Sequence, residues 1–226
     1  MRLGVLFSGG KDSTLALHLA SEKEQVVCLI TVVSKNPESY MFHTPNIDVT
    51  ALQAVALELP LVSVVTEGLK EEELADLEKA IAQAKSKYQI EGVVTGAVES
   101  VYQASRVQRI CNKLNLWCFN PLWKHDQQAL LEELVEKKFK VIISGIFAYP
   151  LDAKWLGKQI DPTVIARLVE LQGQYGISPS GEGGEIETTV LNAPMFKQRI
   201  EILDSISEAK NNCGVFQIKQ AQLVSK

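Results

Sequence analysis

The chain has 226 residues and little cysteine, and its cysteines lack the spacing of a metal or redox site. The four cysteines form no CxxC pair, and each lies in or beside an apolar segment, as is typical of buried thiols in a reducing compartment. The sequence also lacks an apolar run of membrane-spanning length and, at its N-terminus, the apolar stretch and cleavage site of a signal peptide. We therefore expect a cytoplasmic protein that does not contact a membrane.

A strong charge of either sign is missing as well. The chain has 23 Lys and Arg residues against 27 Asp and Glu residues, a formal net charge of -4. A chain of this balance has no general electrostatic attraction to nucleic acid, so we expect no direct nucleic-acid partner. With 46% hydrophobic and 22% charged residues and no internal repeat, the composition is that of an ordinary globular protein.

A pair of glycines separates the first strand-like run from the first helical pattern. The apolar run 3–7 is followed by Ser8, Gly9, Gly10, Lys11, Asp12 and Ser13. A helix that starts directly after a strand leaves backbone N–H groups unpaired in its first turn, where the helix dipole also favours an anion. The glycines let a ligand approach the backbone, and Lys11 adds a positive charge. The segment predicts a phosphate site, the alternative being a glycine-rich turn without a ligand.

Two known loop motifs do not fit this segment. A Walker A loop requires a glycine where Val5 stands and a Ser or Thr where Asp12 stands. The nucleophile elbow of the α/β-hydrolases requires a glycine where Leu6 stands. The residues therefore exclude both of these enzyme classes.

Strand-like and helical patterns alternate through the first half of the chain. The strand-like runs are 3–7, 25–33, 61–65, 92–95 and 116–119. Such alternation predicts a doubly wound, mostly parallel sheet covered by helices on both faces, the Rossmann-like α/β class. Ligands of such sheets bind at the carboxyl ends of the strands, where loop 8–13 lies. After Pro121 the pattern changes, so we expect a first domain of residues 1–122 and a second, smaller α+β domain of residues 123–226.

A second unusual segment, 179–189, combines acidic residues with glycines. Glu182, Glu185 and Glu187 alternate with Gly181, Gly183 and Gly184. Three carboxylates so close together fit poorly into a packed helix or strand. They are suited to binding Mg²⁺, to binding a cationic substrate or to acting as a general base, and the alternative is a solvated acidic loop.

The two segments together resemble a known enzyme family. Ser-Gly-Gly-Lys-Asp-Ser resembles the PP-loop of the N-type ATP pyrophosphatases, of the adenine nucleotide alpha hydrolase-like superfamily with its HUP-type fold. Glu-Gly-Gly-Glu-x-Glu-Thr is similar to the signature of the diphthine–ammonia ligase family. The likeness continues in the same order through residues 38–46, 102–106, 121–123 and 144–145, so it covers nearly the whole chain.

The resemblance implies the last step of diphthamide synthesis. In that step the carboxylate of diphthine, a modified histidine on translation elongation factor 2, becomes an amide with ATP and ammonium, and AMP and pyrophosphate are released. The carboxylate first attacks the α-phosphorus of ATP to form an acyl-adenylate, which ammonia then converts to the amide. Free ammonium is the implied nitrogen source, because the chain has no N-terminal cysteine to release ammonia from glutamine.

The resemblance also implies roles for the residues of the first segment. Ser8, Gly9, Gly10, Lys11, Asp12 and Ser13 would hold the pyrophosphate of ATP. Lys11 and Asp12 would be catalytic, with Asp12 the nearest ligand for Mg²⁺. Analogy with the fold places adenine against Thr31, Val33 and Gly96.

The second ligand is expected at the acidic segment. Glu182, Glu185 and Glu187 would be catalytic there, one of them binding ammonium or accepting its proton. The contacts expected with the substrate are His43, Tyr102, Gln103, Arg106, Gly183 and Gly184. A structural histidine is the alternative for His43, and a surface arginine on a helix is the alternative for Arg106.

Two other functions compete with the ligase. A tRNA-modifying enzyme of the PP-loop superfamily is the first, although such enzymes favour a basic surface and the thiolases among them need paired cysteines or zinc ligands. The second is a regulator that binds an adenine nucleotide without turnover. The acidic segment argues against it, because such a regulator does not need a second polar site. The sequence does not decide whether the protein forms a homodimer.

Overall fold

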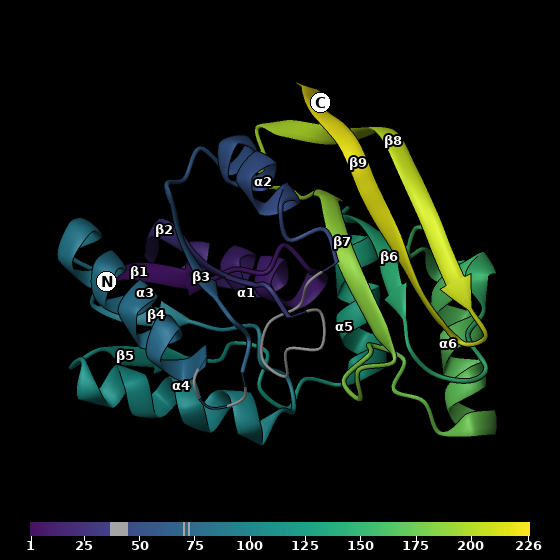
Figure 1. The fold of residues 1–226 in the computed structure, drawn as a ribbon, viewed down its shortest axis with the longest axis horizontal. Helices are drawn as coiled ribbons and strands as arrows, with labels where there is room; N and C mark the ends of the chain where they lie inside the picture. Colours follow the sequence, from purple (N-terminus) through teal and green to yellow (C-terminus); the bar gives the residue numbers. More distant parts are fainter. Residues whose placement is uncertain (37–44, 70, 72) are drawn as a thin grey trace.

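The computed structural model describes residues 1–36, 45–69, 71 and 73–226. Its first half contains a five-stranded sheet in the order β3-β2-β1-β4-β5, and every neighbouring pair of strands is parallel (Figure 1). The strands are β1 (Arg2–Leu6), β2 (Gln25–Ser34), β3 (Leu61–Thr66), β4 (Gly92–Val94) and β5 (Trp117–Phe119). The predicted parallel sheet is therefore confirmed, with each strand close to its expected run.

Helices cover both faces of this sheet. They are α1 (Lys11–Ser21), α2 (Val49–Leu57), α3 (Glu73–Tyr88) and α4 (Val101–Lys113). One buried cluster contains Leu15 of α1 and Ala56 of α2, and the other contains Leu77 of α3 and Val107 of α4. The chain moves outward from β1 to β3 and then returns to β4 on the other side of β1. This reversal is the topological switch point of a doubly wound sheet, where ligands bind.

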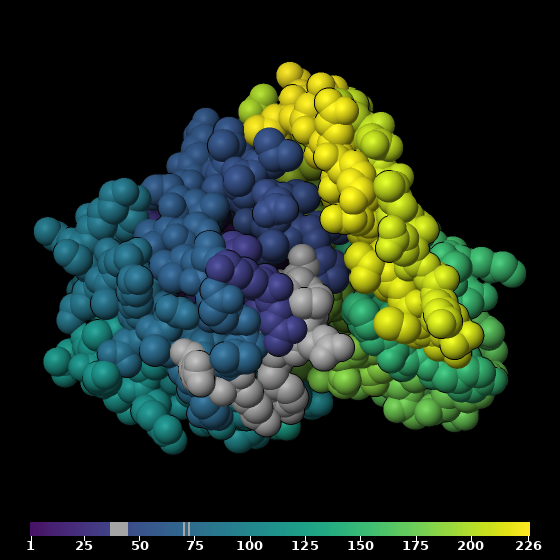
Figure 2. Space-filling view, in the orientation of Figure 1, coloured from purple at the N-terminus to yellow at the C-terminus, as the bar shows by residue number. Residues whose placement is uncertain are grey.

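The second half is built on an antiparallel sheet in the order β7-β6-β9-β8. Its elements are α5 (Gln127–Glu136), β6 (Lys140–Ile146), η1 (Ala153–Trp155), α6 (Pro162–Tyr175), β7 (Ile186–Asn192), β8 (Gln198–Lys210) and β9 (Cys213–Ser225). The hairpin β8–β9 forms the yellow ridge along one side of the molecule (Figure 2). The predicted α+β part is confirmed.

The start of α6 shows why local sequence predicted this helix well. The Asp161 carboxylate accepts a hydrogen bond from the Val164 N–H at 2.8 Å, and Pro162 occupies the first turn. An N-cap carboxylate and an N-terminal proline both stabilise a helix start. The helix ends at Gly176, whose φ of 72° is left-handed, the usual C-terminal cap.

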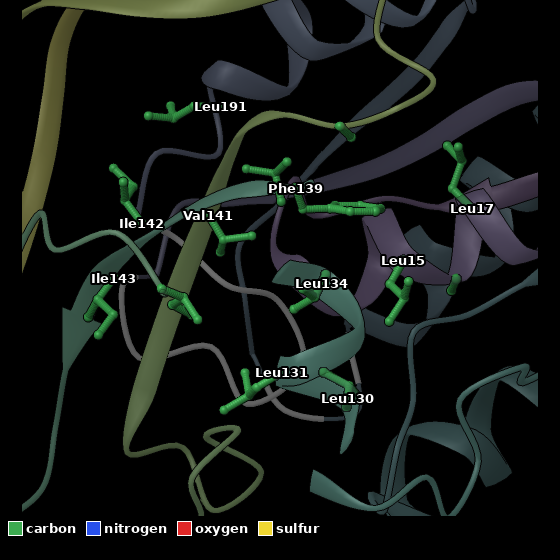
Figure 3. Packing of buried hydrophobic residues seen from close by; sticks show 14 of the residues in the cluster. Leu15, Leu17, Leu130, Leu131, Leu134, Phe139, Val141, Ile142, Ile143 and Leu191 are labelled. Atoms are coloured by element: carbon green, nitrogen blue, oxygen red, sulfur yellow. The ribbon is translucent and has the colours of Figure 1, made fainter. Parts of the chain in front are cut away.

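The two sheets share one hydrophobic core. Leu15 and Leu17 of α1 pack in the same cluster as Leu131 of α5 and Val141 of β6 (Figure 3). The buried faces of α1 and α2 thus pack against the second half of the chain. The domain boundary at residue 122 stays a prediction. No helix of the described residues has the length and apolarity needed to cross a bilayer.

Candidate active site

A cavity of about 380 Å³ lies where the carboxyl ends of β1 and β4 face the loop before β7. One wall contains Ser8, Gly10, Lys11, Asp12, Ser13, Gly96 and Gln103. The opposite wall contains Gly181, Glu182, Gly183, Gly184, Glu187 and Thr188. The two segments that sequence analysis selected therefore face each other across one cavity, although they are far apart in the chain.

The glycine pair turns the chain from β1 into α1. Gly9 has a φ of 77°, a left-handed conformation that glycine adopts without strain. The side chains on either side of the turn hold it together, because Ser8 N–H donates to the Ser13 Oγ at 3.3 Å and the two hydroxyl oxygens lie 3.2 Å apart. Gly10 caps α1 without a side chain of its own, so no side chain of the N-cap residue occupies the first N–H groups of the helix.

A residue of the second half contacts this helix start. The Lys11 N–H donates to the Thr188 Oγ1 at 3.1 Å, and both residues line the cavity. Thr188 directly follows Glu187 of the acidic segment. The helix start and the acidic segment are therefore linked by a hydrogen bond.

Lys11 and Asp12 form an ion pair at the cavity wall. The Lys11 Nζ lies 2.9 and 2.7 Å from the two Asp12 carboxylate oxygens, and the lysine is only 4% exposed. A buried ammonium group without a counter-charge is strongly destabilising, and Asp12 supplies that counter-charge. The pair can stabilise negative charge through Lys11 and bind a cation through Asp12.

Gly96 allows β4 to approach the first turn of α1. A Cβ at this position would lie 2.7 Å from the Asp12 carbonyl carbon and 2.7 Å from the Ser13 nitrogen, both backbone atoms. Any side chain would therefore push the helix start away from the sheet. Gly96 lines the cavity, and its contact with adenine stays a prediction.

Glu182 is the carboxylate of the acidic segment that faces Lys11 and Asp12. Its Oε2 accepts a hydrogen bond from the Glu99 backbone N–H at 3.2 Å. Burial raises the pKa of the Glu182 carboxyl above its usual value, the negative charge of Asp12 raises it further, and the positive charge of Lys11 opposes both. A carboxylate with a raised pKa is a better proton acceptor, which is the property of a general base.

Glu185 has a different position from Glu182. Its Oε1 accepts the Ser178 backbone N–H at 2.9 Å, and a Cβ on Gly183 would lie 2.5 Å from the same oxygen. Glu185 is not among the described residues that line the cavity. Its carboxylate instead closes the segment into a compact loop that leaves Glu182 and Glu187 facing the cavity.

Comparison with known proteins agrees with this arrangement. The model of the diphthamide synthase N-terminal domain matches residues 1–117, and the model of the diphthamide synthase C-terminal domain matches residues 126–224. The chain belongs to the diphthamide synthase family. Diphthine–ammonia ligase from Mus musculus is 35% identical, over 96% of this chain and 88% of that protein, and the Homo sapiens ligase has the same identity and coverage. The family resemblance read from the sequence is confirmed.

Two solved structures are also similar to this diphthamide synthase family member. One is a predicted subunit of tRNA methyltransferase from Methanocaldococcus jannaschii, with a TM-score of 0.47 and 18% identity over 86% of this chain and 98% of that one. The other is the U34-tRNA thiolase NcsA from Methanococcus maripaludis, with a TM-score of 0.39 and 14% identity over 81% of this chain and 70% of that one.

Two of the residues expected to contact adenine lie on β2, whose side chains point alternately to two faces, and only one of these faces lines the cavity. The Thr31 hydroxyl is buried and donates to the Phe7 carbonyl oxygen at 2.6 Å, so it holds β2 to the end of β1. The neighbouring side chains Ile30 and Val32 line the cavity, because successive side chains of a strand point to opposite faces. Adenine binding by Thr31 and Val33 stays a prediction, and the apolar wall lies one residue away from them.

Among the residues expected to contact the substrate, some line the cavity and others do not. Gln103 lines the cavity in this family member, and His43 lies outside the described residues. The Arg106 guanidinium lies 3.4 Å above the Tyr102 ring and donates to the Glu71 carboxylate, which also accepts from the Tyr102 hydroxyl at 3.1 Å. Tyr102 and Arg106 thus form a surface cluster with Glu71, and their contact with substrate stays a prediction.

Sequence reasoning missed two polar residues of the site. Thr188 belongs to the quoted acidic motif but carried no signal for contact with α1. Gln53 is fully buried in α2, and its Nε2 donates to the Gly9 and Val190 carbonyl oxygens. A glutamine among the apolar residues of a helix was the available signal for Gln53, because buried polar side chains need partners.

Proposed function

We propose that this diphthamide synthase family member amidates diphthine on translation elongation factor 2, with ATP and ammonium as co-substrates. The products are diphthamide, AMP and pyrophosphate. The observation that carries the proposal is the shared cavity. It is lined both by the phosphate loop, residues 8–13 with Lys11, and by the acidic segment with Glu182. The names of the relatives, diphthine–ammonia ligases, support the same reaction.

The phosphate loop serves the first chemical step. A carboxylate is a poor electrophile, so the diphthine carboxylate attacks the α-phosphorus of ATP, the bond to the β-phosphate oxygen breaks, and pyrophosphate leaves from the acyl-adenylate. Negative charge grows on the departing pyrophosphate. Lys11 and the N–H groups at the start of α1 stabilise this charge. The apolar wall around Ile30 and Val32 suits the adenine ring.

Mg²⁺ fits this site through Asp12. The described residues contain no group of three or more His, Cys, Asp or Glu side chains that could hold a metal by themselves. Magnesium sites for nucleotides commonly use one or two carboxylates together with phosphate oxygens and water, and Asp12 is the cavity carboxylate that belongs to the phosphate loop. Bound Mg²⁺ would neutralise phosphate charge, and Asp12 is the residue that would hold it.

Glu182 serves the second step. Ammonia attacks the carbonyl carbon of the acyl-adenylate, AMP leaves with the electrons of the broken C–O bond, and the nitrogen must lose a proton to become an amide. Glu182 faces Lys11 and Asp12, and its raised pKa makes it a proton acceptor. A carboxylate in this position also attracts the ammonium ion into the cavity.

The test is an assay of AMP and pyrophosphate formation by the purified protein. We expect both products only when ATP, ammonium and elongation factor 2 carrying diphthine are all present. Lys11→Ala should slow their formation by about 100- to 1,000-fold, because a charge-stabilising group is lost. The exposed Lys35, which pairs with Glu67 away from the cavity, supplies the control Lys35→Ala.

Other outcomes of this assay would contradict the proposal. AMP release that depends on tRNA would indicate a tRNA-modifying enzyme. Tight AMP binding without turnover on any acceptor would indicate a nucleotide-binding regulator. Normal pyrophosphate release by Lys11→Ala would show that the loop does not hold pyrophosphate.

A further inference from the structure

Gln53 connects the phosphate loop with both halves of the chain. Its side-chain Nε2 lies 2.9 Å from the Gly9 carbonyl oxygen and 2.8 Å from the Val190 carbonyl oxygen. The Val190 N–H donates to the same Gly9 oxygen at 3.0 Å. The Gly9 carbonyl is therefore held by two donors, one from α2 and one from β7.

The orientation of the Gln53 amide is determined by these contacts. Both of its partners are carbonyl oxygens, which only accept hydrogen bonds, so the NH₂ end must face them. The Oε1 end has no hydrogen-bond partner among the described residues. It lies against Gly9, where a Cβ would be only 2.2 Å from it. A side chain at position 9 would collide with Gln53 as well as strain the backbone.

The position of the Gly9 carbonyl determines where the next N–H points. A trans peptide is planar, and its C=O and N–H point in opposite directions. Since the Gly9 oxygen is held against α2 and β7, the Gly10 N–H points away from them, on the side of the Ser8 hydroxyl at 3.5 Å. Gly10 and Ser8 line the cavity, whereas Gln53 lies behind the loop.

A peptide between two glycines is the easiest kind to rotate, because neither residue has a Cβ that restricts φ and ψ. Rotation by half a turn would place the Gly9 carbonyl oxygen in the cavity and remove the Gly10 N–H from it. A carbonyl oxygen repels a phosphate, while an N–H group binds one. Gln53 makes the rotated arrangement unfavourable, because rotation would break its hydrogen bond to the Gly9 carbonyl oxygen.

We infer that Gln53 is a positioning residue for pyrophosphate: it holds the Gly9–Gly10 peptide in the orientation that presents the Gly10 N–H to the β- and γ-phosphates of ATP. This inference rests on the part of the proposed function in which the loop binds ATP, and it is independent of the acceptor. Val190 belongs to β7, which begins within the acidic segment. The Gln53 side chain therefore links the position of the phosphate loop to the segment expected to bind the acceptor.

Gln53→Met tests the inference, because methionine has a similar length and no hydrogen-bond donor. Calorimetric titration should show affinities for ATP and for pyrophosphate about tenfold lower, as expected for one misdirected hydrogen bond, and an AMP affinity within about twofold of the unchanged protein. AMP lacks the two phosphates that the loop holds. Gln128→Met is the matched control, since Gln128 is exposed on α5, where its side-chain amide donates to the Glu132 carboxylate at 2.8 Å.

A purely structural role for Gln53 would give a different pattern. Equal losses of ATP and AMP affinity, or unchanged pyrophosphate affinity in a folded Gln53→Met protein, would overturn the inference. If the variant does not fold, the side-chain amide resonances of Gln53 in the unaltered protein are followed by NMR. They should shift with pyrophosphate and not with AMP, and equal responses to the two ligands would also overturn it. Failure of the unaltered protein to bind ATP or pyrophosphate would instead count against the proposed function.

Discussion

Glu182 and Glu185 are chemically identical and three residues apart, yet their surroundings give them different properties. Burial and then the negative charge of Asp12 raise the pKa of Glu182, while the hydrogen bond from the Glu99 backbone N–H opposes this rise. Glu185 is turned away and receives the Ser178 N–H. The environment of a carboxylate, more than its place in a motif, decides whether it can accept a proton during catalysis.

The raised pKa of Glu182 predicts a pH dependence. Only the deprotonated form accepts a proton, so amidation at constant free ammonia should rise with pH through the raised pKa and level off above it. Glu182→Gln should lack this limb and be slower by about 100-fold or more, the usual contribution of a general base. The measurement is the initial rate of AMP formation at saturating ATP across the acidic and neutral range.

The control for this prediction is Glu99→Gln. Glu99 anchors Glu182 through its backbone N–H, and its own carboxylate is exposed and lies 3.8 Å from the Lys124 Nζ. The Glu99 charge is the smallest of the influences that raise the pKa of Glu182, so the substitution should keep the rate and the pH limb and move the limb only slightly toward lower pH. An unaltered pH limb in Glu182→Gln would assign the titration to another group.

At the scale of elements, the site depends on how closely β4 approaches α1. The first turn of α1 carries the N–H groups and the ion pair of the cavity, and its distance from the sheet is limited by a residue that follows β4. That residue is Gly96, the second residue after the end of β4. The helix start is thus positioned by a strand that is distant in sequence.

Gly96→Ala should displace the start of α1. Its Cβ would meet backbone atoms at 2.7 Å, which a side-chain rotation cannot relieve. We expect a loss of stability of roughly 1–3 kcal/mol from overpacking. ATP affinity should fall by about tenfold or more, since a misplaced helix start loses hydrogen bonds to phosphate. Chemical denaturation and calorimetric titration measure the two effects.

Gly173→Ala is the matched glycine control. Gly173 lies within α6, and a Cβ there meets no atom within 4 Å. Alanine in a helix is more favourable than glycine, so this variant should gain roughly 0.5–1 kcal/mol and bind ATP normally. Normal ATP binding by Gly96→Ala would show that the close approach is not required.

At the scale of the whole molecule, the two halves are joined by packing as well as by the chain. Leu15 of α1, Leu131 of α5 and Val141 of β6 belong to one buried cluster. The Lys197 N–H also donates to the Ala56 carbonyl oxygen at the end of α2 at 2.6 Å. Neither half can expose its part of this shared cluster without exposing the part that belongs to the other half.

This shared core predicts one cooperative unfolding transition. Differential scanning calorimetry should give equal calorimetric and van't Hoff enthalpies for the full chain. Leu131→Ala, in α5, should destabilise that single transition by about 2–5 kcal/mol, because it leaves a cavity in the shared core. Pyrophosphate should raise the same transition temperature. Two separable transitions, with only one shifted by Leu131→Ala, would show that the halves fold independently.

Local patterns predicted most of the fold and part of the site. The order of strands and helices in the first half and the start of α6 at Asp161 followed from periodicity and capping, which are properties of neighbouring residues. Lys11 and Glu182 lie in contiguous motifs and were found for that reason. Adenine binding at Thr31 and Val33 stays a prediction. The sequence did not show that the side chains of Ile30 and Val32 line the cavity, because a strand pattern does not reveal which of its two faces meets it.

The amino-acid sequence alone determined the family, the alternation that forms the parallel sheet, and the two segments that carry phosphate and acidic chemistry. Only the tertiary structure decided which glutamate faces Lys11, and that Gln53 holds a carbonyl 44 positions away in the chain and another 137 positions away. The reason is physical. Helix and strand periods depend on neighbours in sequence, whereas hydrogen bonds between distant segments depend on how the whole core packs.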